Sequence, residues 1–311
     1  MVFSDLIPNT TPSKPLDRNI SNITPSATTK NNYPITMILE EIQRRYADGE
    51  TDFRDIDLSN QLLGGLDLRE VDLRGANFRG ADLAGANLSD SNLREADLTG
   101  ANLTEAQLHR TNLIEANLTD SCCFQANFAD SSLRASDLSK ANFTAANLSF
   151  TILSDAIISS TDFTQAKLSE ATLTRVKLLD CKFYQANLEG ANFTGATLIN
   201  VDLTEANLAR SLFNNSKTLG ANFQRADLSR ARINKADMSA ANFSDANLRE
   251  ANLTWTTLRE ANFYRAKLYR AKLCWANLSK ANLVEAVLLD ADLTQANLTG
   301  ADLTMAIMSN A

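Results

Sequence analysis

The sequence predicts an all-β solenoid, and three observations support this fold class. A five-residue unit (a small residue, Asn or Asp, Leu or Phe, then two polar residues) repeats from residue 51 almost to the end of the 311-residue chain. No residue is inserted or deleted through 52 consecutive units. The small and the large apolar residue flank one polar residue, as in a β-strand, and the last two positions favour a turn. A period of five would scatter apolar side chains around an α-helix, which excludes a helical fold.

The spacing of phenylalanine predicts the size of one coil. We call the Leu/Phe position of each unit the centre. Several phenylalanine centres are separated by four units or a multiple of four units: Phe143, Phe163, Phe183, Phe223, Phe243 and Phe263. If four units form one coil, these rings lie in one column and stack, as side chains do in ladders of parallel strands. We therefore expect about 13 four-unit coils over residues 51–311.

The repeated unit resembles the signature of a known family. Residues 101–105, Ala-Asn-Leu-Thr-Glu, and dozens of similar units match the signature of the pentapeptide-repeat proteins. The resemblance covers about residues 51–311 and implies a right-handed quadrilateral β-helix. Residues 44–53 also look like the segment that leads into the repeats of many cyanobacterial members. For function the resemblance implies only a range, since some members modulate heterocyst development and others mimic duplex DNA in type II topoisomerases.

The first 50 residues differ from the repeats. All five prolines lie in residues 1–34 among many Ser, Thr and Asn residues, which predicts a disordered tail. Residues 35–50 carry apolar side chains at helical spacing, Ile38 and Ile42 among them, and we expect a capping helix over the first coil. A partner-binding helix is the alternative. The sequence has no secretory signal and no apolar run of about 20 residues, so we expect no membrane span.

Composition argues against catalysis and cofactor binding. The four cysteines show no Cys-x-x-Cys spacing, and His109 is the sole histidine. A zinc site or a nucleophilic triad needs several converging ligands or partners, so we expect no catalytic, metal-binding or cofactor-binding residues and no enzyme activity. Since the cysteines do not form a disulfide framework either, a reducing, cytoplasmic location is expected.

Outward-pointing aromatic residues are the candidates for partner binding. Trp255 and Trp275 are four units apart and should stack at one corner. Leu179 and Ile199, with Leu219 as a further candidate, should form an outward apolar column on the next face. The remaining candidates are expected near the tryptophans: Tyr264, Tyr269, Arg265, Arg270 and Lys272. Trp, Tyr and Arg dominate binding hot spots, although an aromatic ladder could simply rigidify the solenoid.

Two units and the last coil depart from the pattern. Cys123 and Thr218 are poor centres, each followed by a large apolar residue, Phe124 or Leu219. The favoured interpretation is a local bulge that turns the following residue inward. No helix follows the last coil in this sequence, so its strand edges are expected to pair with a second copy, giving a homodimer.

These observations predict a non-catalytic protein–protein interaction scaffold or regulator, and cyanobacterial cell differentiation (heterocyst regulation) is one role that the family resemblance implies for it. The alternative is a DNA-mimic modulator of a type II topoisomerase (gyrase). Residues 51–160 hold 16 acidic and 8 basic side chains, which suits mimicry, whereas residues 161–311 hold 15 and 17, which does not. Direct nucleic-acid binding through residues 225–280 is unfavoured, because the sequence pI is near 4.9.

Overall fold

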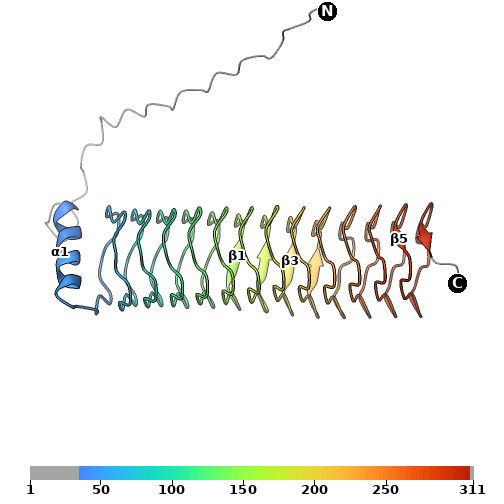
Figure 1. The fold of residues 1–311 in the computed structure, drawn as a ribbon, viewed down its shortest axis with the longest axis horizontal. Helices are drawn as coiled ribbons and strands as arrows, with labels where there is room; N and C mark the ends of the chain where they lie inside the picture. Colours follow the sequence, from blue (N-terminus) through green and yellow to red (C-terminus); the bar gives the residue numbers. More distant parts are fainter. Residues whose placement is uncertain (1–34, 309–311) are drawn as a thin grey trace, which may run out of the picture. The chain divides into compact units, whose positions relative to one another are not determined.

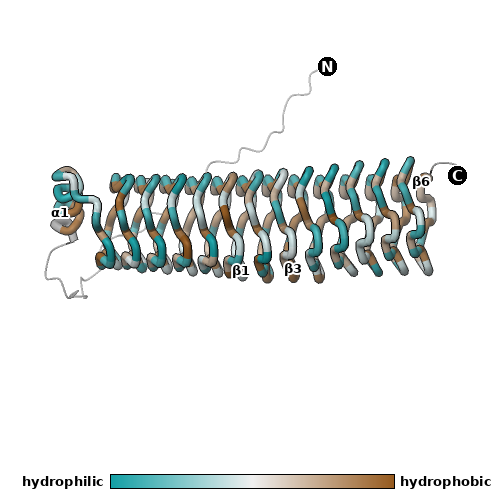
Figure 2. Tube along the Cα trace, turned by 90° about the horizontal axis from the view of Figure 1, so that it is seen from below, coloured by the Kyte–Doolittle hydropathy of each residue, from teal (hydrophilic) through white to brown (hydrophobic). Residues whose placement is uncertain are grey.

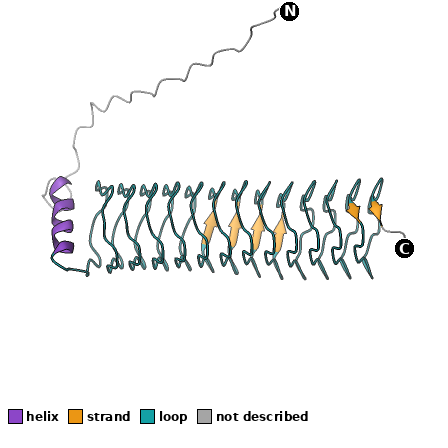
Figure 3. Ribbon diagram, viewed as in Figure 1, coloured by secondary structure: helices purple, strands orange, loops and turns teal. Residues whose placement is uncertain are grey.

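One helix and a long coil of short extended segments make up the described part of the chain. The computed structural model describes residues 35–308, so the tail expected at residues 1–34 lies outside the described residues. Helix α1 (Ile35–Ala47) precedes the coil (Figure 1). The regular strands pair in parallel as two sheets (Figure 3): β1 (Ile157–Ser159), β2 (Lys177–Leu179), β3 (Thr197–Ile199) and β4 (Lys217–Leu219) in one, and β5 (Val287–Leu288) with β6 (Ile307–Met308) in the other.

Each unit of the coil is bridged to the fourth unit after it. Asp52 is bridged to Asp72, and the same register still joins Asn282 to Asp302. The strands keep it as well, since Ile157 pairs with Lys177. A two-residue corner follows every three-residue extended segment, so one coil of four units has four sides and four corners. The four-unit coil predicted from the phenylalanine spacing is confirmed by this register.

We number the sides from the first coil. Side 1 starts at residues 51–53, side 2 at 56–58, side 3 at 61–63 and side 4 at 66–68, and each later coil continues the same numbering. A corner takes the number of the side that it follows. The second residue of most corners has a positive φ, as in a type II turn. On each side the small residue and the centre are buried and the residue between them faces outward, so hydropathy alternates along the coil (Figure 2).

Two stacks of phenylalanine rings fill much of the interior behind side 3. The rings of Phe143 and Phe163 lie 5.2 Å apart between centroids, and a second stack joins Phe223 to Phe243 at 4.8 Å. All of these side chains are fully buried. Stacked pairs contribute about 0.5–1.5 kcal/mol beyond the burial of their area. Leu203, the side 3 centre between the two stacks, interrupts the column.

The bulges expected at Cys123 and Thr218 are absent, and that prediction was wrong. Both centres stay inside, at 0% and 1% exposure, while Phe124 and Leu219 point outward at 36% and 64%. Each small centre lies in a coil that carries an additional ring. The coil of Thr218 holds Phe213 and Phe223 edge to face at 6.0 Å, and the coil of Cys123 holds Phe128, whose ring lies 5.4 Å from Phe143.

Helix α1 packs against the first coil. Ile42 is 1% exposed and belongs to the same apolar core as the repeats. The Arg45 guanidinium lies over the ring of Phe53 at 4.9 Å, and Tyr46 Oη donates a hydrogen bond of 3.3 Å to the carbonyl of Arg69. The helix ends before Gly49, whose φ of 91° reverses the chain into the first unit.

The last described coil is more open than the rest. The centres Leu293, Leu298 and Leu303 are partly exposed, and Met308 is 44% exposed. Within residues 35–308, the sole helix is too short and too polar to cross a bilayer.

Candidate interaction site

The two tryptophans form a stacked pair at corner 1. Trp255 and Trp275 are the second residues of this corner in successive coils, and their ring centroids lie 4.9 Å apart at an interplanar angle of 3°. Both side chains are about half exposed, at 55% and 50%. The left-handed backbone of the corner (φ of 63° and 60°) directs both rings outward. The pair therefore presents a rigid aromatic edge to solvent.

A second aromatic group lies one side away, at corner 4. Two guanidinium groups approach the ring of Tyr269: that of Arg249 at 4.9 Å and that of Arg270 at 4.8 Å. Sequence reasoning missed Arg249, although it stands at the same position of the preceding coil as Tyr269 and was therefore detectable. Lys272 lies on side 1 of the next coil, between Tyr269 and Trp275 along the chain. We call these residues and the tryptophan pair the aromatic–basic strip.

Tyr264 and Arg265 do not join this strip. They occupy corner 3, which is diagonally opposite the tryptophans at corner 1. There the Arg265 guanidinium lies 5.4 Å from the Tyr264 ring centroid and forms a 2.9 Å ion pair with Glu285. The expectation that they lie near the tryptophans was wrong, because two units of sequence carry the chain halfway around a four-unit coil.

The apolar column forms at corner 2, in earlier coils. Leu179 pairs in register with Ile199, and Ile199 with Leu219, across β2, β3 and β4. Leu179 is 40% and Leu219 64% exposed, with Ile199 partly exposed between them. The corner of Leu219 lies two coils before that of Trp255, so the structure separates this column from the aromatic–basic strip.

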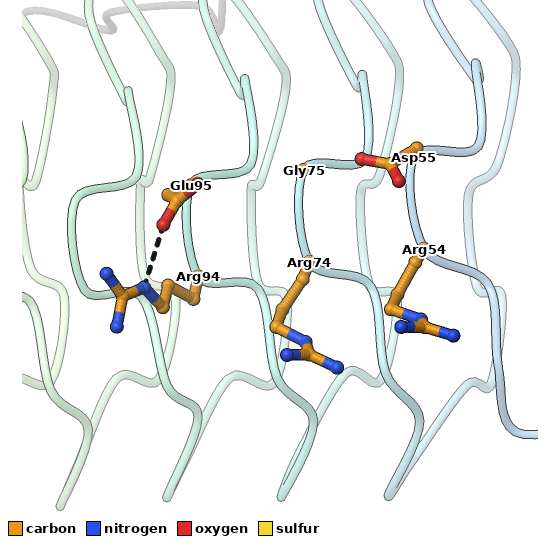
Figure 4. Close-up of a pocket in the computed structure, with 6 residues that line it drawn as sticks. All are labelled: Arg54, Asp55, Arg74, Gly75, Arg94 and Glu95. Carbon is orange, nitrogen blue, oxygen red and sulfur yellow. Dashed lines mark hydrogen bonds and ion pairs between the residues drawn. The ribbon is translucent and has the colours of Figure 1, made fainter.

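A hollow of about 350 Å³ opens at corner 1 of the first coils. Arg54, Arg74 and Arg94 line one edge in a row, and Gly75 forms the floor between Asp55 and Glu95 (Figure 4). A Cβ at Gly75 would collide with the Asp55 carboxylate, so glycine maintains the space. Each arginine already has a carboxylate partner: the distances are 2.5 Å from Arg54 to Asp52, 2.6 Å from Arg74 to Asp72 and 2.9 Å from Arg94 to Glu95. The hollow is therefore charge-compensated and offers no unpaired cation to an anionic ligand.

The arrangement around His109 does not form a catalytic set. Its Nε2 lies 3.9 Å from the Asp90 carboxylate, but Arg110 binds that carboxylate at 2.6 Å. The Arg110 hydrogen bond also lowers the pKa of Asp90. Within residues 35–308, no group of His, Cys, Asp and Glu side chains is arranged to hold a metal ion, and all four cysteines are free thiols.

Comparison with solved structures gives relatives with repeats of the same kind. The chain is 30% identical to HetL, described as a pentapeptide repeat protein involved in heterocyst differentiation regulation from the cyanobacterium Nostoc, over 86% of this chain and 96% of HetL, with a TM-score of 0.25. It is 13% identical to QnrB1, described as a plasmid-mediated fluoroquinolone resistance protein, over 83% and 92%, with a TM-score of 0.23. A third relative is Rfr23 from the cyanobacterium Cyanothece, at 24% identity over 44% and 64%, with a TM-score of 0.12.

The family comparison covers the whole repeat region. No curated protein matches the chain. The family described as pentapeptide repeats matches in eight copies, which together span residues 51–310. Members of this family form right-handed quadrilateral β-helices and are generally non-enzymatic scaffolds. This chain belongs to the pentapeptide-repeat family.

Proposed function

We propose that this protein is a non-catalytic protein–protein interaction scaffold or regulator whose partner binds the aromatic–basic strip. The observation that carries the proposal is the half-exposed, stacked pair of Trp255 and Trp275. Rigid aromatic side chains provide contact area at a low cost in conformational entropy, and Trp, Tyr and Arg are enriched in hot spots. The buried interior is filled by Leu, Phe and Ala, so the variable exterior carries specificity.

The charges of the strip indicate the chemistry of the partner. Lys272 is exposed on side 1 and is bridged to Asp292 of the next coil, whose pKa is lowered first by a hydrogen bond from Cys274 and further by the charge of Lys272. Tyr269 lies against two guanidinium groups, each of which also has a carboxylate partner: Glu250 at 3.3 Å from Arg249 and Asp290 at 3.6 Å from Arg270. A partner surface with an apolar centre and a carboxylate beside it fits this order: apolar contact at the tryptophans and the carboxylate toward Lys272.

The biological role that we propose is regulation of cell differentiation in a cyanobacterium, with the protein in the cytoplasm. HetL, the relative involved in heterocyst differentiation regulation, is 30% identical over most of both chains. In this proposal α1 is a cap for the first coil, as the burial of Ile42 suggests, over a stack of about 13 coils. The partly exposed centres of the coil that ends at Met308 could also pair with those of a second copy. Sedimentation equilibrium would test that pairing, and a monomer at high concentration would exclude it.

Affinity capture from a cyanobacterial lysate tests the partner-binding face. The parent is compared with the double variant Trp255→Ser plus Trp275→Ser, and thermal melting verifies that both are folded. A matched control replaces two other outward corner aromatics, Phe124→Ser plus Phe150→Ser, which are 36% and 57% exposed. We expect a protein captured by the parent and the control but lost from the tryptophan variant. Capture of the same set by all three would refute the aromatic–basic strip as the binding face.

The alternative, a DNA-mimic modulator of gyrase, rests on the acidic first half of the repeats. Residues 51–160 carry 16 acidic and 8 basic side chains. Many of these acids are already paired, as Asp155 is with Arg175 at 2.6 Å, so the surface presents less uncompensated charge than the count implies. A gyrase subunit captured by the parent and retained by the tryptophan variant would favour this alternative over the scaffold.

A further inference from the structure

Over seven coils of side 2 the outward residues form a column whose charge changes sign about one apolar residue, and Asp237 follows in the next coil. The residues are in continuous parallel register, each one coil from the next. In order they are Asp97, Asn117, Asp137, Ile157, Lys177, Thr197 and Lys217. One coil on either side of Ile157 the column has Asp137 and Lys177, and three coils on either side it has Asp97 and Lys217. The polar neutral residues Asn117 and Thr197 occupy the intermediate coils.

The groups of this column are available for contact. Ile157 is 57% exposed, and Lys177 and Lys217 are exposed without an ion pair to any described residue. Asp137 accepts the backbone N–H of Ser139 at 2.9 Å, which leaves its second carboxylate oxygen open. Asp97 has an exposed side-chain fraction of 39%, and its nearest cation is Arg79 at 3.9 Å. Two acids and two amines therefore lie on one flat side, where the nearest opposite charges are Arg79 for Asp97 and, in the coil after Lys217, the bridged Asp237.

We propose that side 2 is the self-complementary interface of an antiparallel homodimer. A two-fold axis that crosses the rod at Ile157 places Ile157 against its own copy. The same rotation places Lys177 opposite Asp137 of the second copy and Lys217 opposite Asp97 of the second copy. An isologous interface needs this kind of self-complementarity, because each contact occurs twice. Parallel pairing would instead set like charges against each other. This inference is independent of the partner proposed for the aromatic–basic strip.

The adjoining corners are compatible with this pairing. A two-fold axis lying across side 2 brings corner 2 of one copy against corner 2 of the other, so Lys140 meets Asp180 of the second copy. Leu219, 64% exposed, meets the small corner formed by Thr99 and Gly100. In the central coil the charged group at corner 1 is Asp155, and Arg175 holds it at 2.6 Å. None of these rows sets unpaired like charges opposite each other.

The size of the face predicts a weak dimer that is sensitive to salt. Six coil spacings of about 4.8 Å separate Asp97 from Lys217, so the column is about 29 Å long. With its two corners the face is about five extended residues, or roughly 16 Å, wide. Pairing would bury about 1,000 Å² in total, the lower limit for a specific interface. We expect a dissociation constant in the micromolar range. The dimer should become weaker as the Debye length shrinks from about 10 Å at about 0.1 M salt to about 3 Å at about 1 M salt.

Analytical ultracentrifugation with charge-reversal variants tests the proposal. The parent should dimerise at about 0.1 M salt and dissociate at about 1 M. Two variants, Lys177→Glu plus Lys217→Glu and Asp97→Lys plus Asp137→Lys, should each be at least about tenfold weaker, yet a mixture of the two should form heterodimers. The matched control, Lys167→Glu plus Lys267→Glu, reverses two exposed lysines at the same unit position on side 4 and should dimerise like the parent. A monomeric parent, a dimer unaffected by reversal, or no heterodimer would overturn the proposal.

A distance measurement separates this dimer from pairing through the last coil. A spin label is placed at Thr197→Cys in a background in which Cys122 and Cys274, the two partly exposed thiols, are serine. Antiparallel pairing on side 2 puts the two labels about 20 Å apart, from four coil spacings along the axis and about 10 Å between packed sheets. Pairing through the last coil would separate them by more than about 50 Å, and that distance would overturn the proposal.

Discussion

Thr218→Val is expected to stabilise the protein, although the repeat favours leucine at this position. Thr218 is 1% exposed, and its Oγ1 has no hydrogen-bond partner among the described residues. A buried hydroxyl without a partner costs about 1–3 kcal/mol, and valine removes it without changing the side-chain volume. For a chain of this size each kcal/mol corresponds to about 2–4 °C in melting temperature. We therefore expect Thr218→Val to melt at least about 2 °C above the parent, followed by circular dichroism.

Two control variants test separately the two parts of this argument, the side-chain volume and the unpartnered hydroxyl. Thr218→Leu removes the same hydroxyl but adds volume to a coil that already holds Phe213 and Phe223, and such overpacking costs about 1–3 kcal/mol. It should melt below Thr218→Val. Thr256 is equally buried, but its hydroxyl donates a 2.6 Å hydrogen bond to the carbonyl of Ile233, so Thr256→Val should be destabilising.

The outcome also reports on the other unpartnered hydroxyl of this unit. Ser216 Oγ is buried on the same side, two residues before Thr218, and likewise has no partner among the described residues. A decrease in melting temperature for Thr218→Val would refute the energetic argument, because it would mean that the hydroxyl has a stabilising partner, as a buried water between the two hydroxyls would be. A melting temperature for Thr218→Leu above that of Thr218→Val would refute the volume argument.

Two further predictions concern ionisation. Cys274 Sγ donates a 2.7 Å hydrogen bond to Asp292, and this bond raises the pKa of the thiol. Asp292→Asn should therefore lower the pKa of the Cys274 thiol and speed its alkylation by iodoacetamide near pH 8. An unchanged alkylation rate would count against the contact. Hydrogen bonds from Arg54 lower the pKa of Asp52 to about 2, below its ordinary value, so this contribution to stability is complete above about pH 4 and is lost as the pH falls toward 2. Between those pH values the melting temperature should fall less steeply in Asp52→Asn than in the parent, and parallel curves would contradict the assignment.

The sequence was sufficient to predict the size of one coil, because the repeat period is visible along the chain. Phenylalanines four units apart predicted a column, and the stacked rings of Phe163 and Phe183, at 4.7 Å, lie in it. The sequence was insufficient at Cys123 and Thr218, because the repeat pattern compares each centre only with the Leu or Phe that is usual at that position. The volume that matters is summed over the four centres of one coil. There Thr218 makes room for two rings, and Cys123 accompanies Phe128.

The same distinction explains which part of the candidate site was predicted. The stacking of Trp255 on Trp275 follows from a separation of four units, and so does their common corner. Tyr264 was wrongly expected near the tryptophans, because residues one or two units apart in sequence lie at different corners of the coil. A count of charges over long segments averages four sides together and hides the order on any one of them. When the outward residues of one side are read separately, side 2 passes from Asp137 through Ile157 to Lys177.

The physical origin of this order lies in how the fold divides its positions. The inward residues must fill each coil to a constant volume, so they can vary only with compensation inside the same coil. The outward residue of each side does not share this volume constraint, although many outward Asn and Asp side chains are hydrogen-bonded, as Asn77 is to Asp57 of the preceding coil at 3.0 Å and to the backbone N–H of Arg79 at 3.1 Å. The backbone register is kept where lysine occupies this position, as at Lys177 and Lys217, so each side can acquire its own sequence of charges. A surface free to vary in this way will carry a sign reversal centred on one exposed isoleucine only by chance or through selection for a contact, and the charge-reversal mixture distinguishes the two.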